Sequence, residues 1–206
     1  MSFNNYLVME SKEIMKMRNR NKMCYLTSGN ILPMPRVGLY VDYPNLYATM
    51  RDKGSQPDLE KLLAVSQSLG NLIFAKYYTT IHTDFYNSSI LGLERIGYTI
   101  IPRFVPDTDY GLKKDVDTFL AVDAVTDLLE NKLDILIIAS NDSDFSPVMK
   151  LTREKGKVAV AMVSRHDEAK LISESATVYI EGMWGKSIRQ SAEEIETEVQ
   201  IAQEVF

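Results

Sequence analysis

Residues 134–145 read DILIIASNDSDF, and their pattern indicates the fold class. The short run from 134 to 139 is typical of a strand buried on both faces of a sheet. Asp142 and Asp144 follow where that strand would end. A helical pattern from 145 to 154 comes next and stops at Gly156. A buried strand, a polar turn and a helix in this order indicate an α/β protein.

The same alternation extends in both directions along the chain. Predicted strands cover 37–41, 72–78, 98–104, 134–139, 158–163 and 177–180. Predicted helices cover 58–69, 87–96, 116–130, 145–154 and 167–173. Right-handed crossovers between these elements predict a three-layer α/β/α sandwich with a mostly parallel central sheet. Ligands bind outside the carboxyl ends of the strands in such sheets, so the loops there are the ones to inspect.

The overall composition is that of one globular domain. The chain has 206 residues, of which 45% are hydrophobic and 25% charged, so a sizeable core is expected. No apolar run reaches the roughly 18 residues of a membrane span, and no secretion signal opens the sequence. We therefore expect a cytoplasmic protein without a membrane partner. Cys24 is the only cysteine, which excludes an internal disulfide and argues against a cysteine zinc site.

The charge is unevenly distributed along the chain. The formal net charge is −5, which argues weakly against a nucleic-acid partner. After Arg189 there are five glutamates and no lysine or arginine, so residues 1–189 are close to neutral overall. A cation that neutralised the aspartates described below would leave that part positive. A polyanionic substrate is therefore compatible with the sequence.

The two ends of the chain differ from the predicted domain at 37–184. Residues 1–36 contain six lysines and arginines against two glutamates, so they form either a solvated terminus or an arm that contacts RNA. Residues 185–206 are predicted to form an acidic amphipathic helix. Its apolar positions recur at steps of four and three, at Ile188, Ala192, Ile195, Val199, Ala202 and Phe206. This seam either docks on the domain or pairs with a second subunit in a homo-oligomer.

Aspartates gather where the predicted strands end. Asp42 and Asn45 follow the strand at 37–41, Asp142 and Asp144 follow the strand at 134–139, and Asp117 opens the helix at 116–130. Each one alone could simply cap a helix. Together they would repel one another, and a divalent cation would relieve that repulsion. A ligand set made only of oxygen atoms favours Mg²⁺ or Mn²⁺.

The helix at 116–130 carries two further aspartates. Asp123 lies six residues after Asp117, which places it about 120° away around the helix. Asp117 is therefore the better direct ligand. Asp123 could bind a second ion, hold a water or orient a neighbour. Asp127 lies one turn further on, and we expect it to be a solvated charge.

A long connection at 102–114 supplies candidate substrate-binding residues. It contains Arg103, Tyr110, Lys113 and Lys114. Basic and aromatic residues together suit single-stranded nucleic acid, through phosphate contacts and base stacking. The alternative is that the lysines are solvated and that neighbouring aromatic residues such as Tyr77 belong to the core.

Three motifs in this chain resemble those of the NYN domain family, a branch of the PIN-like nuclease superfamily, and within it the LabA-like proteins. The resemblance runs from about Val37 to Glu181. The motifs are Asp42 with Asn45, then Lys114-Asp115-Val116-Asp117 followed by Asp123, then Ser140-Asn141-Asp142-Ser143-Asp144-Phe145. Asp115 and Asn141 replace glycines of the family pattern. Asn tolerates the left-handed region, so a tight turn at Asn141 would survive.

The resemblance implies a PIN-like fold of Rossmann-like topology and metal-dependent cleavage of RNA phosphodiester bonds. By this resemblance the metal ligands would be Asp42, Asp117, Asp142 and Asp144, with Asn45 on the phosphate or the attacking water and Ser140 fixing the loop. The alternative function is that of a LabA-like regulator of gene expression that binds RNA or protein without useful turnover. A nucleotide-binding Rossmann domain is disfavoured, because no glycine-rich loop follows the strand at 37–41. A phosphoacceptor receiver domain would need two acids after that strand, but only Asp42 is there. A Toprim-type domain would need a glutamate after that strand, where this chain has Asp42.

Overall fold

The computed structural model of the protein describes residues 26–27, 30–31, 34–51, 54–82, 88–105, 116–164, 169–182 and 185–187. The strands are β1 Leu26–Thr27, β2 Asn30–Ile31, β3 Arg36–Asp42, β4 Ser55–Pro57, β5 Asn71–His82, β6 Tyr98–Val105, β7 Ile135–Ala139, β8 Val158–Val163, β9 Val178–Glu181 and β10 Gly185–Ser187. The helices are α2 Tyr43–Arg51, α3 Leu59–Ser68, α4 Ser88–Ile96, α5 Val116–Leu129, η1 Ser143–Phe145, α6 Ser146–Glu154 and α7 Lys170–Ser175. None of these described helices is long and apolar enough to span a membrane.

A six-stranded sheet in the order β6-β5-β3-β7-β8-β9 forms the centre of the molecule. Every neighbouring pair in this sheet is parallel. The chain runs from β3 outward through β5 to β6, and then returns to add β7, β8 and β9 on the other side of β3. This is the strand order of a Rossmann-like sheet, whose ligand crevice opens where the order reverses. In this protein the reversal lies between β3 and β7.

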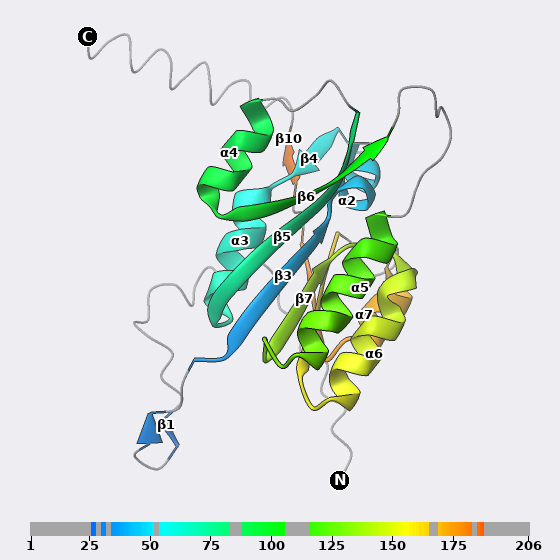
Figure 1. The fold of residues 1–206 in the computed structure, drawn as a ribbon. Helices are drawn as coiled ribbons and strands as arrows, with labels where there is room; N and C mark the ends of the chain where they lie inside the picture. Colours follow the sequence, from blue (N-terminus) through cyan, green and yellow to red (C-terminus); the bar gives the residue numbers. More distant parts are fainter. Residues whose placement is uncertain are drawn as a thin grey trace, which may run out of the picture.

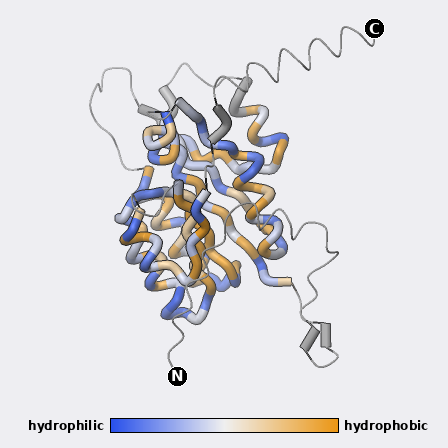
Figure 2. Tube along the Cα trace, turned by 180° about the vertical axis from the view of Figure 1, so that it is seen from behind, coloured by the Kyte–Doolittle hydropathy of each residue, from blue (hydrophilic) through white to orange (hydrophobic). Residues whose placement is uncertain are grey.

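Helices cover both faces of the sheet, which confirms the predicted α/β/α sandwich (Figure 1). Alternate residues of β3 belong to two separate cores, because successive side chains of a strand point to opposite faces. Leu39 and Val41 pack with α2 and α3, whereas Tyr40 packs with α5, α6 and α7. Asp42 follows Val41 and therefore faces α5. The central strands are mainly hydrophobic, whereas polar and hydrophobic residues alternate along the helices (Figure 2).

The first connection of the sheet contains a helix that the sequence did not reveal. Helix α2 begins at Tyr43, directly after β3, and Pro44 lies in its first turn. A proline is tolerated there because the first N–H groups of a helix have no partner within the helix. Asp42 Oδ1 accepts a hydrogen bond from the backbone N–H of Asn45 at 3.3 Å, as a helix N-cap does. The candidate ligand Asp42 thus also caps α2.

The chain segment after the sheet also differs from the prediction. Residues Gly185–Ser187 form strand β10, which pairs antiparallel with β4 in a small separate sheet. A helix expected from 185 therefore does not start there, and the rest of the predicted C-terminal helix lies outside the described residues. Of the predicted arm at 1–36, β1 and β2 form a short antiparallel hairpin. Arg36 already belongs to β3, so the sheet begins one residue before the predicted domain.

Candidate functional site

The candidate site lies at the carboxyl edge of the sheet, where the parallel strands end. Asp42 ends β3 and is 1% exposed. Ser140 follows β7, and its hydroxyl donates a hydrogen bond to Asp42 Oδ2 at 2.8 Å. The same hydroxyl oxygen accepts from the backbone N–H of Asp142 at 3.0 Å. Ser140 therefore links the end of β3 to the loop after β7, at the reversal of strand order, and holds the Asp42 carboxylate in place.

A second set of hydrogen bonds holds the loop after β7. The backbone N–H of Asn141 donates to Asn45 Oδ1 at 3.0 Å. The Asn141 side chain donates to Thr49 Oγ1 at 3.2 Å and to Ser164 Oγ at 2.9 Å, and its Oδ1 accepts from the Ser164 N–H at 2.9 Å. Asn141 does not adopt a left-handed backbone, since Asn131 is the one non-glycine residue with positive φ in the described part of the chain. The Asn141 side chain instead links three elements of the site.

The environment of Asp42 disfavours its charge. Burial, together with the negative charges of Asp117 and Asp142, raises the pKa of Asp42 to about 7, against the hydrogen bonds from Ser140 and Asn45, which lower it. Desolvation and like charges both penalise the ionised carboxylate. The mutual repulsion expected from the sequence is therefore present between the ends of β3, α5 and the loop after β7. A cation near Asp42 would offset it.

Of the other predicted ligands, Asp117 and Asp142 lie near enough to Asp42 to raise its pKa, and Asp117, Asp142 and Asp144 are all partly or fully exposed to solvent. Asp117 lies in the first turn of α5 and is partly exposed. Asp142 caps η1, because its Oδ1 accepts from the backbone N–H of Asp144 at 2.9 Å. Across the described ranges, no three acidic, histidine or cysteine side chains are close enough to hold a metal ion as they stand. The donor chemistry fits Mg²⁺ or Mn²⁺, but binding would have to draw these carboxylates together.

The later aspartates of α5 lie apart from this group. Asp123 Oδ2 accepts from the Tyr78 hydroxyl at 2.6 Å and lies 3.5 Å from Lys76 Nζ. The charge of Asp117 instead raises the pKa of Asp42. Asp117 and Asp123 therefore lie on different sides of the helix, as their spacing predicted. This places Asp123 beside β5 rather than beside the carboxylates of the site.

Asp127 is not solvated, so that expectation was wrong. It is 4% exposed and accepts from the Tyr40 hydroxyl at 2.9 Å, from Lys76 Nζ at 2.6 Å and from Lys132 Nζ at 2.9 Å. Burial alone would raise the pKa of Asp127, but these three hydrogen bonds outweigh it and lower the pKa below its ordinary value. The helix sequence could not reveal this, because Tyr40 and Lys76 come from the sheet.

Among the substrate-binding residues predicted in the connection at 102–114, Arg103 is the one that the structure describes. It lies on β6 with its guanidinium 4.9 Å from the centre of the Phe119 ring of α5. Tyr110, Lys113, Lys114 and also Asp115 lie outside the described residues. Tyr77 is 5% exposed and belongs to the core, as the alternative interpretation had it.

A shallow pocket of about 390 Å³ lies beside the loop after β7. Its walls are formed by Asn45, Asn141, Asp142, Ser143, Ala169, Lys170 and Leu171. Lys170 was missed from the sequence, although it follows the predicted strand at 158–163 and so lies near the same edge. Phe119 was missed as well, and its outward position on the predicted helix is the signal that could have found it.

Comparison with known proteins agrees with this architecture. Residues 36–183 match the NYN domain. The uncharacterized protein MJ0482 of Methanocaldococcus jannaschii is 27% identical over 161 residues, which are 77% of this chain and 61% of that protein. The chain thus spans about three-fifths of the length of this curated relative. In structure, the chain resembles VPA0982, a protein of unknown function from Vibrio parahaemolyticus.

The TM-score for that structure is 0.62 at 18% identity, covering 76% of this chain and 96% of that chain, so the likeness shows the fold. The NYN match extends over most of the chain and includes every strand of the six-stranded sheet. An NYN domain suggests a nuclease-like function related to RNA. On this match, the chain belongs to the NYN domain family.

Proposed function

We propose that this protein is a divalent-metal-dependent ribonuclease that cleaves single-stranded RNA at the carboxyl edge of its sheet. The single observation that carries the proposal is the buried carboxylate of Asp42, which is held by Ser140 and is under the repulsion of Asp117 and Asp142. A buried acid surrounded by further acids at the ligand crevice of an NYN domain has a ready physical use in binding a cation.

The residues that would hold Mg²⁺ or Mn²⁺ are Asp42, Asp117, Asp142 and Asp144. When bound, such an ion lowers the pKa of water and stabilises charge on a phosphodiester. The chain itself would position the substrate. Asn45 lines the pocket, and its Oδ1 accepts a hydrogen bond from the Asn141 N–H. Its Nδ2 donates to no other described residue, so this amide can donate to a phosphate oxygen. Lys170 lines the same pocket and supplies positive charge.

The test is cleavage of a labelled single-stranded RNA by the purified chain with Mn²⁺, with Mg²⁺ and with EDTA. Asp142→Asn removes one carboxylate of the site. Glu154→Gln is the matched control, because it removes an exposed carboxylate at the far end of α6. We expect cleavage that needs the metal, is lost in Asp142→Asn and persists in Glu154→Gln. Absence of cleavage with both metals, although Mn²⁺ binds the folded protein, would refute the ribonuclease.

A second candidate is a regulator of the LabA-like kind, which binds RNA or a protein partner without turnover. One observation favours it: within the described part of the chain, the carboxylates are not gathered into a ready metal site. The same experiment separates the two functions. A regulator would bind RNA with similar affinity in wild type and in Asp142→Asn, and neither protein would cleave it.

A further inference from the structure

An exposed aromatic ring and a partly exposed arginine form a pair at the same edge of the sheet as the candidate site. Phe119 of α5 is 51% exposed, and the guanidinium of Arg103 of β6 lies 4.9 Å from the centre of its ring. We propose that this pair is a stacking site for an unpaired base of the RNA strand whose backbone engages Asp42. The inference rests on the proposed function and adds a substrate subsite to it. Arg103 would contact a phosphate while the Phe119 ring stacks on the base.

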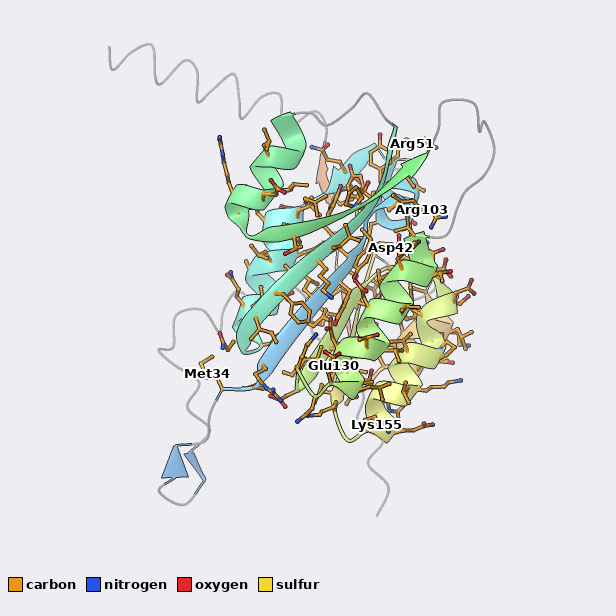
Figure 3. The ribbon with its side chains drawn as sticks, viewed as in Figure 1. Met34, Asp42, Arg51, Arg103, Glu130 and Lys155 are labelled. Carbon is orange, nitrogen blue, oxygen red and sulfur yellow. The ribbon has the colours of Figure 1, made fainter. Side chains whose placement is uncertain are left out.

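The sheet register places Arg103 close to Asp42. Asp42 pairs with Tyr78 on β5, and Tyr78 pairs with Ile101 on β6, so these three residues form one row across the sheet. Neighbouring strands lie about 4.8 Å apart and residues rise about 3.3 Å along a strand. Arg103 comes two residues after Ile101, so its backbone lies roughly 12 Å from that of Asp42. Figure 3 shows Arg103 and Asp42 at the same end of the sheet.

Both side chains of the pair belong to the face of the sheet that α5 covers. Ile101 packs against the core on the α5 side, and Arg103 has the same parity along β6. On α5, Phe119 and Asp117 are two residues apart and differ by about 200° around the helix. Asp117 acts on Asp42 of β3, whereas Phe119 meets β6. The start of α5 thus presents a candidate metal ligand on one flank and an aromatic ring on the other.

The chemistry of the pair suits a nucleotide. Within the described part of the chain, the Arg103 guanidinium contacts the Phe119 ring and forms no ion pair with a carboxylate. A guanidinium is a strong hydrogen-bond donor to a phosphate. Stacking on an aromatic side chain tolerates every base, which fits a single strand held without sequence preference.

A protein partner on α5 is the competing explanation. Val122 and Leu129 are 58% and 60% exposed and continue an apolar stripe from Phe119. Leu129 lies ten residues beyond Phe119, about 15 Å along the helix axis and away from the carboxyl edge. A base would use the Phe119 end of this stripe alone, next to the charge of Arg103 and to the site. A protein would cover the stripe along its whole length.

The experiment is titration of the full chain with short single-stranded RNAs that carry one 2-aminopurine, whose fluorescence reports stacking. It is done with EDTA and again with Ca²⁺, so that cation-dependent binding is also seen. The variants are Phe119→Leu, Phe119→Trp and the control Leu129→Ala. We expect Phe119→Leu to weaken binding by roughly 5- to 100-fold and to abolish the quenching at one position. Phe119→Trp should retain both, and Leu129→Ala should behave as wild type.

The outcomes separate this inference from the ribonuclease. Equal binding by wild type and Phe119→Leu, with cleavage intact, would overturn the stacking site alone. Quenching that depends on Phe119 in a protein that never cleaves RNA would support the stacking site and overturn the ribonuclease. A change of molecular mass in solution on both Phe119→Leu and Leu129→Ala, with RNA binding unaltered, would assign the stripe to a protein interface and overturn the inference.

Discussion

Replacing Asp42 by asparagine is expected to stabilise the metal-free protein, even though it removes the central candidate ligand. The side chain is 1% exposed and faces the charges of Asp117 and Asp142. The ionised form of Asp42 therefore destabilises the folded protein, which lowers the free energy of unfolding. Asparagine has nearly the same shape and no charge, so it removes that cost.

The sign and the size of this change in stability follow from the pKa of Asp42. Burial, together with the charges of Asp117 and Asp142, raises it from 3.8 to about 7, so the folded chain keeps a proton that the unfolded chain has released. The contribution of Asp42 to the free energy of unfolding therefore falls as pH rises from about 4 to about 7, and this contribution is constant above that window. A shift of about three units at about 1.36 kcal/mol each sets a ceiling of about 4 kcal/mol. The altered hydrogen bonds with Ser140 and Asn45 reduce the gain to about 1–3 kcal/mol.

The assay is urea unfolding of wild type and Asp42→Asn in EDTA, at about pH 5 and about pH 8.5. The advantage of the variant should grow between these two pH values. Added Mn²⁺ should raise the free energy of unfolding of the wild type and leave that of Asp42→Asn unchanged. Asp144→Asn, an exposed aspartate of the neighbouring loop, is the matched control and should change stability less. A variant that is no more stable than wild type at the higher pH would refute the reasoning.

Three further predictions concern stability. Asp127→Ala should cost about 1–3 kcal/mol in urea unfolding, because it leaves the Tyr40 hydroxyl without its acceptor and the half-buried Lys76 amino group with the more distant Asp123, 3.5 Å away; a cost below about 0.5 kcal/mol would contradict this. Hydrogen bonds from Arg36 lower the pKa of Asp134, so its stabilising contribution is present at neutral pH and is lost as pH falls below the ordinary value. Asp134→Asn should therefore be less stable than wild type at neutral pH and converge with it in acid, and a gap that does not narrow would exclude this account. Gly38→Ala should cost about 1–3 kcal/mol, since a Cβ atom there would lie 2.7 Å from the Phe74 ring, and Phe74→Leu in the same chain should recover part of the loss.

The sheet was predictable because its strands are apolar runs separated by clear helical patterns. The stretches at 134–139 and 158–163 are short apolar runs between helical patterns, which is typical of strands buried on both faces of a parallel sheet. Helix α2 was not predictable, since Tyr43 and Pro44 directly after a strand resemble a turn. Strands β4 and β10 have three residues each, which is too few for an alternation of polar and apolar side chains to be recognised in the sequence.

For the site, the edge was predictable and the contacts were not. The rule for parallel sheets placed Asp42 and Asp142 at one edge from their positions after predicted strands. The partners of Asp127 could not follow from the same reasoning, because Lys76 lies 51 residues away and its side chain crosses from the sheet to the helix. Burial of Asp42 is likewise a property of the assembled layers, and no local pattern encodes it.

The link between Ser140 and Asp42 has a consequence for the chain while it is being made. These residues are 98 positions apart, and their contact exists only when β7 has joined β3. A nascent chain that has reached β6 already contains Asp42 and Asn45 but lacks Asp117, Ser140 and Asp142. The acidic group is therefore completed only by the second half of the sheet. On the proposed function, an unfinished polypeptide beside the messenger RNA that encodes it would be inert, and nuclease activity would appear only with the finished fold.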